Sequence, residues 1–189
     1  EALVDEIEGF WSQHAAVVEQ NFRENAEEGR FVGHLLLASL EWDAESLCLE
    51  LAERWNIQVE SELTDSSLNF DVEDMQVEIS LHEGQMEHHA AQIHAASNID
   101  WPEVLDIVNY HQAYLKVMVK SGASRLEAGK LHVKVMSCLS MQDNVLAVDA
   151  AGTIFEPGLY DEYSDLMKDG SLPLYNMIHF GFYRTSKGL

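Results

Sequence analysis

Histidines concentrate in one short stretch of the chain, and imidazole is the side chain best suited to metal binding and to proton transfer near neutral pH. Residues 78 to 102, EISLHEGQMEHHAAQIHAASNIDWP, hold four of the nine histidines. The stretch closes with Asn98, Trp101 and Pro102. We therefore expect any chemistry of this chain to be carried by this segment.

One interpretation is a metal site inside a helical bundle. If the segment is helical, Glu78 and His82 are one turn apart on one face, and His89 lies further along the same face. These three side chains would supply ligands from one helix. However, the di-metal pattern of four-helix bundles uses Glu-x-x-His motifs, and the sequence contains none. The simpler alternative is that each histidine is an interfacial or core imidazole with a hydrogen-bond partner.

Another interpretation is a haem ligand, which requires one histidine near the end of a helix. Helical spacing places His94 on a shoulder of the apolar stripe at that end, whereas His88 points to solvent. In the following segment, His111 falls in the middle of an apolar stripe, which predicts a buried imidazole there.

The elements that would position these residues are predicted to be long helices. All three prolines lie beyond residue 100, and glycine is sparse before residue 152. Ser124 and Glu127 have the spacing of a helix-capping box. We predict an all-α domain with helices at about 2–27, 30–56, 71–97, 102–120 and 124–151.

The last part of the chain differs from the rest. Residues 152–189 contain two of the three prolines and seven of the thirteen Tyr and Phe residues. Aromatic side chains at this density need cover. We therefore divide the chain into a helical domain, 1–151, and a C-terminal extension, 152–189, packed on the domain or on a partner subunit.

Charge limits the partners. The formal net charge is −22, and residues 1–100 carry 23 acids against three arginines. Nucleic acids and anionic membrane surfaces reward positive charge, so neither is expected as a partner. The acidic half is expected to be either a solvated face or a docking surface for a basic partner. No apolar run is long enough for membrane insertion, and the isolated Cys48 and Cys138 resemble buried thiols of a cytoplasmic protein.

The histidine-rich segment, residues 78 to 102, resembles the proximal-histidine signature of the sensor globins, the haem domains of globin-coupled sensors. The matching residues are Ile93-His94, Asn98, Ile99 and Trp101-Pro102, and residues 131–150, LHVKVMSCLSMQDNVLAVDA, are similar to the family's last helix. The resemblance covers about residues 85–151. Asn98 stands where the family usually has Gly, and no tyrosine precedes Tyr110 for a distal pocket.

The resemblance implies a globin-like fold of five or more long helices and a haem-based sensor of a diatomic gas, O2, CO or NO. His94 would be the proximal ligand of the haem iron, with His89, Ile93, Trp101 and His111 around the cofactor. Signal transduction would use the C-terminal extension, a homodimer or a larger assembly. The alternatives are a non-catalytic acidic interaction or scaffold subunit, and a helical bundle that binds a metal or pigment. No nucleophile and base could be combined from the sequence, so we assign no catalytic residue.

Overall fold

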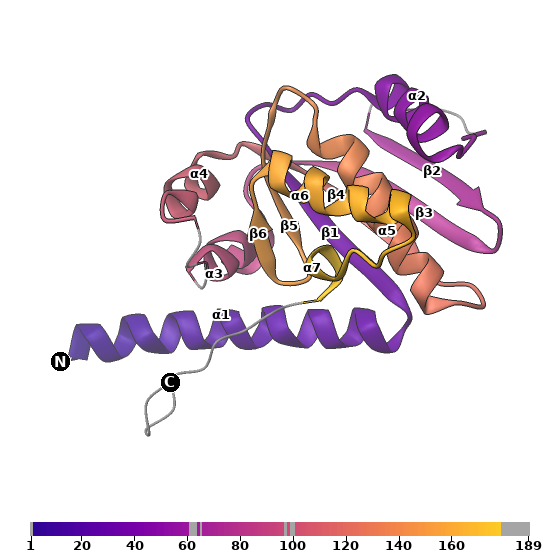
Figure 1. The fold of residues 1–189 in the computed structure, drawn as a ribbon. Coiled ribbons are helices and arrows are strands. Elements are labelled where there is room, and N and C mark those ends of the chain that lie inside the picture. Colours follow the sequence, from indigo (N-terminus) through magenta and orange to yellow (C-terminus); the bar gives the residue numbers. More distant parts are fainter. Residues whose placement is uncertain (1, 61–63, 65, 97, 99–100, 179–189) are drawn as a thin grey trace.

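A β-sheet forms the centre of the molecule. The computed structural model describes residues 2–60, 64, 66–96, 98 and 101–178, with side chains from residue 9 onward, and contains an antiparallel sheet in the order β2-β3-β4-β1-β5-β6 (Figure 1). The prediction of an all-α, globin-like domain is therefore wrong. The strands are β1 (Arg30–Leu37), β2 (Ser67–Val72), β3 (Met75–Glu83), β4 (Ala113–Lys120), β5 (Val145–Ala150) and β6 (Thr153–Phe155).

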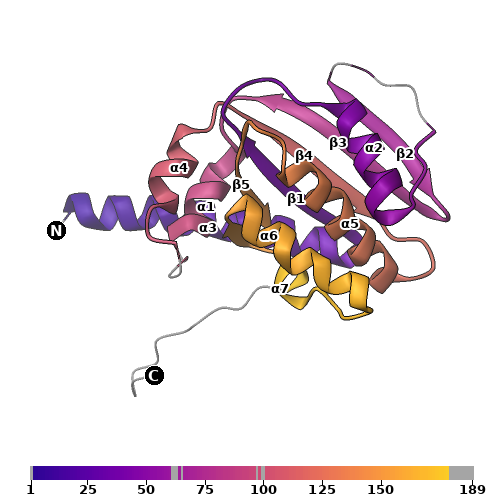
Figure 2. The same cartoon turned by 45° about the horizontal axis from the view of Figure 1, so that its top comes forward.

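Helices cover the sheet on both sides (Figures 1 and 2). We call the two sides the α5 face, which packs against α2, α5 and α6, and the α1 face, which packs against α1, α3 and α4. The helices are α1 (Ala2–Glu27), α2 (Ala44–Trp55), α3 (Ala90–Ala96), α4 (Val104–Tyr110), α5 (Arg125–Ser140), α6 (Pro157–Ser164) and α7 (Leu174–Met177), with 3₁₀ turns η1 (Glu87–His89) and η2 (Asp165–Asp169).

Alternation of apolar and polar residues explains why helices were predicted where strands occur. In β3, Met75, Val77 and Ile79 are buried on the α5 face, whereas Gln76 and Glu78 are exposed on the other face. A period of two is the pattern of a strand with one buried face.

The same error affects four predicted helices, because each contains at least one strand. The range 30–56 divides into β1 and α2, and 71–97 contains the end of β2, then β3, η1 and α3. The range 102–120 divides into α4 and β4, and 124–151 into α5 and β5. In each case the strand buries a row of its side chains beneath the helices that cover the sheet, and local helix propensity does not predict such burial.

Some local predictions are confirmed. The first helix was predicted at 2–27, which are the observed bounds of α1. Ser124 caps α5, since its hydroxyl accepts a hydrogen bond from the Glu127 amide at 3.3 Å. Cys48 and Cys138 are free thiols in α2 and α5. Burial raises the pKa of the Cys138 thiol to about 12, so this group is an unreactive part of the core.

The C-terminal segment continues the same core as far as it is described. β6 pairs with β5, so the boundary placed at residue 151 falls in the turn between two neighbouring strands. Tyr160 is fully buried in α6, and Tyr163 stacks on Tyr175 with ring centroids 5.0 Å apart.

Among the described helices, none combines the length and the apolar character needed to cross a bilayer.

Candidate functional site: a buried carboxylate between two histidines

The α1 face holds a buried carboxylate between two imidazoles. Asp149 on β5 pairs directly with His34 on the neighbouring strand β1, so both side chains point to the same face. Helix α3 packs over this face and contributes His94. Asp149 is 3% exposed; its Oδ1 lies 2.9 Å from Nδ1 of His94, and its Oδ2 lies 3.6 Å from Nδ1 of His34.

The charges of this cluster stabilise one another. Burial alone would raise the pKa of Asp149, but the charges of His94 and His34 and the hydrogen bond of His94 outweigh it and hold this pKa well below its usual range. Burial likewise opposes protonation of His94, but the charge and hydrogen bond of Asp149 raise the pKa of His94 overall. The pair therefore favours an ionised carboxylate with an imidazolium at mildly acidic pH.

A row of aromatic and hydroxyl groups continues from this cluster across β4 and β3. The ring centroid of Tyr114 lies 5.8 Å from that of His34 and 4.8 Å from that of His82, and Tyr114 and His82 are nearly parallel. Nε2 of His82 lies 2.9 Å from the Ser80 hydroxyl. His34 and His82 thus lie on one face of the adjacent strands β3, β4, β1 and β5, and His94 comes from helix α3 over this face.

A carboxylate that holds an imidazole through Nδ1 can serve as the support of a general base or of a metal-ligating histidine. A metal site would need further ligands. In the part of the chain that the structure describes, no group of three or more His, Cys, Asp or Glu side chains could hold a metal ion. The cluster as described brings together one carboxylate and two imidazoles.

The structure places the residues predicted around a haem in different surroundings. His94 belongs to the Asp149 cluster, and Ile93 and Trp101 are half-buried. His89 is exposed in η1 and contacts the rings of α1, 5.2 Å from His14. The prediction of haem binding remains untested, but its premise is lost because the globin-like fold is wrong.

The alternative metal ligands also lie apart. Glu78 and His82 are four residues apart on strand β3, which separates their Cα atoms by about 13 Å at a rise of about 3.3 Å per residue. His89 is in η1, a separate element. The spacing that would align Glu78 and His82 on a helix separates them on a strand.

His111 is buried, which confirms one sequence prediction, and it has a structural role. Its Nε2 accepts a hydrogen bond from the Met86 amide at 3.2 Å, while Nδ1 donates to the carbonyl of Val108. Burial lowers the pKa of this imidazole. His88 is exposed, also as predicted.

Sequence reasoning gave Asp149 no role, and it considered His34 only as a possible distal residue of a haem pocket, so the pairing of these two residues was not predicted. His34 lies inside the run RFVGHLLL, where it interrupts apolar residues, and Asp149 is the one polar residue of the strand VLAVDA. A polar group buried in a strand needs a partner, and that signal could have drawn attention to both.

No match to this chain was found in a scan of protein-family models, a search of curated proteins or a search of solved structures.

Proposed function

We propose that this chain is a non-catalytic interaction module whose first helix binds a basic segment of another protein. The observation that supports the proposal is the high solvent exposure of the α1 side chains. None of residues 9–27 is buried, although the helix has 26 residues. Phe10, Trp11 and Phe22 are 46%, 41% and 52% exposed. Large apolar side chains exposed along one element are typical of an interaction surface.

The helix is nevertheless held against the domain. It packs against β1, α3 and η1, and the rings of His14 and Phe10 lie 5.2 Å and 5.7 Å from the ring of His89 in η1. The N-terminal turns of α1 extend past α3 and α4 (Figures 1 and 2). A partner would therefore meet a preformed helix, which lowers the entropic cost of binding.

Charge selects the kind of partner. Residues 1–28 carry eight acids and one arginine, a net charge of −7 (1 − 8). A second copy of the chain would place this charge against an equal one, which opposes self-association through the helix. Lys and Arg side chains suit the surface better, since they pair with carboxylates and also bind the faces of Phe10 and Trp11.

A synthetic peptide tests this proposal. The probe is a fluorescent amphipathic peptide of Leu, Lys and Arg, about 18 residues in length and therefore long enough to form a helix. The control is an otherwise identical peptide in which Glu replaces Lys and Arg. We expect the basic peptide alone to bind, with an affinity that falls as salt rises. The double variant Trp11→Ala, Phe22→Ala should weaken binding about tenfold or more.

Tyr110→Ala is the matched control variant, because Tyr110 is an aromatic side chain that is 80% exposed on a different helix, α4. Its peptide affinity should equal that of the unmodified chain. The proposal fails if the basic peptide does not bind, if it binds no better than the acidic one, or if the α1 double variant binds equally well. A dimer in light scattering that the double variant dissociates would instead assign the surface to a second copy.

A further inference from the structure

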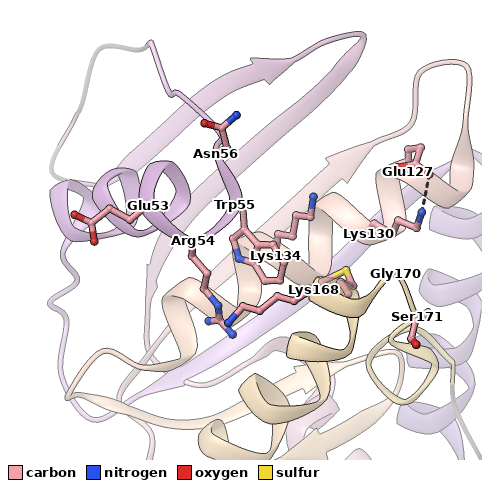
Figure 3. Close-up of a pocket in the computed structure, with 11 residues that line it drawn as sticks. Glu53, Arg54, Trp55, Asn56, Glu127, Lys130, Lys134, Lys168, Gly170 and Ser171 are labelled. Carbon is pink, nitrogen blue, oxygen red and sulfur yellow. Dashed lines mark hydrogen bonds and ion pairs between the residues drawn. The ribbon is translucent and has the colours of Figure 1, made fainter.

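The α5 face carries a hollow that is chemically unlike the rest of this acidic chain. It lies between the end of α2, the outer side of α5 and η2, and has a volume of about 450 Å³ (Figure 3). This is within the range of about 300–1,000 Å³ that is typical of small-molecule sites. The chain has eleven Lys and Arg residues, and four of them line this hollow: Arg54, Lys130, Lys134 and Lys168.

Three of these cations gather around one indole. The guanidinium of Arg54 lies 5.1 Å from the ring centroid of Trp55, and the ammonium groups of Lys134 and Lys168 lie 5.3 Å and 5.9 Å from it. The side chains come from three separate elements, α2, α5 and η2. Figure 3 shows them converging on the same indole. Such convergence in a chain of net charge −22 concentrates positive charge at one place.

Carboxylates already engage most of this positive charge. Arg54 is 16% exposed and pairs with Asp161 at 2.5 Å and with Asp165, so its planar fork is occupied. Lys168 shares Asp165 at 2.8 Å. These pairs fasten α6 and η2 to the end of α2 and leave little of the Arg54 charge for a ligand.

Lys134 differs from its neighbours. Lys130 pairs with Glu127 at 2.9 Å, within the same helix, whereas among the described residues no carboxylate lies within ion-pair distance of Lys134. The Lys134 side chain is half-buried, and its described contact is with the Trp55 ring. An ammonium held over an indole without a carboxylate keeps its capacity to bind an anion.

We propose that this hollow binds a small phosphate-bearing ligand, with Lys134 as the central contact and Lys130 and Lys168 as flanking contacts. The donors left for a ligand are lysine ammonium groups, which bind phosphate as point charges. A carboxylate ligand is better served by a bidentate arginine, and the Arg54 fork is already occupied. The site is on the opposite side of the sheet from α1, so it is independent of the interaction proposed for that helix.

Titration of the full chain with inorganic pyrophosphate tests the proposal. The readout is the indole N–H signal of Trp55 in a proton–nitrogen NMR spectrum, assigned from a Trp55→Phe variant, with calorimetry for the dissociation constant. We expect a saturable shift of this signal. Lys134→Gln should weaken binding about tenfold or more, because it removes the central positive charge.

Lys116→Gln is the matched control, since it removes the same charge from an exposed position of β4 on the α1 face. It should change the affinity by less than about twofold. Lys168→Gln provides a second test at an exposed position and should also weaken binding. The proposal is overturned if the Trp55 signal does not saturate, or if Lys134→Gln and Lys116→Gln weaken binding equally. Equal affinity for citrate would overturn the choice of phosphate.

Discussion

Asp149 and His94 are 55 residues apart in the sequence, yet Oδ1 of the carboxylate lies 2.9 Å from Nδ1 of the imidazole. The contact joins α3 to the sheet, because Asp149 is a buried residue of β5, the strand next to the β6 edge. Its two partners respond to pH in opposite directions.

The sign of the pH effect follows from the two pKa shifts. The pKa of His94 is raised, so its contribution to stability is full below the unfolded value of about 6.5 and is lost as pH rises through the folded pKa. The pKa of Asp149 is lowered, so its contribution is present above about 3.9 and is lost as pH falls through the folded pKa. The pair stabilises the fold most between these limits.

We predict that Asp149→Asn lowers the free energy of unfolding by about 1.5–3 kcal/mol near pH 5.5, the size expected for a hydrogen bond to a charged group. The deficit should narrow near pH 8.5, where His94 is less protonated. Urea denaturation at both pH values measures it, and NMR titration of His94 should show its pKa falling in the variant. Asp143→Asn, at an exposed loop position, is the control. An unchanged His94 pKa in Asp149→Asn would contradict the assignment.

His111→Leu should destabilise the domain for a different reason. Leucine cannot accept the hydrogen bond of the Met86 amide, and an unsatisfied buried donor costs about 1–3 kcal/mol. Because burial lowers the pKa of His111, the wild-type imidazole stabilises the fold above about pH 6.5 and loses that contribution as pH falls below it. The variant should therefore lose less stability between pH 7 and 5, as measured by thermal unfolding. An identical slope in both proteins would rule out this role.

Gly33→Ala tests the packing of β1 on α5. A Cβ at this position would lie 2.7 Å from Cε of Met136 and 3.0 Å from Cε1 and Nε2 of the buried His132 ring. The ring has little freedom to move, so we expect a loss of about 1–3 kcal/mol in the free energy of unfolding. Gly158→Ala, in α6, meets no atom within 4 Å and should cause no loss. Equal stability of Gly33→Ala and the unmodified chain would show that the neighbouring side chains of α5 can move to accommodate the added methyl group.

The largest sequence error was a choice of period. In β3 the residues of one parity are Met75, Val77 and Ile79, which is strict alternation. The same residues also fit a loose helical stripe, and the scarcity of glycine and proline in this part of the chain favoured a helical interpretation. The alternation was available in the sequence, but pairing of β3 with β4 is a long-range event that no local pattern specifies.

Local signals were sufficient where structure depends on neighbours along the chain. The bounds of α1 and the Ser124 cap of α5 follow from helix propensity and capping, which act within a few residues. Burial of His111 followed from its apolar surroundings in sequence. The net charge of −22, which directs the choice of a basic partner, is also a property of composition alone.

Only the tertiary structure decided which side chains meet. His94 was chosen from its place in the sequence, but its partner Asp149 is set by the β1–β5 register and by the packing of α3 over that face. The convergence of Arg54, Lys134 and Lys168 on Trp55 depends in the same way on α2, α5 and η2. Contacts between distant segments arise from burial of apolar surface shared by the whole chain, and no short stretch of residues encodes them.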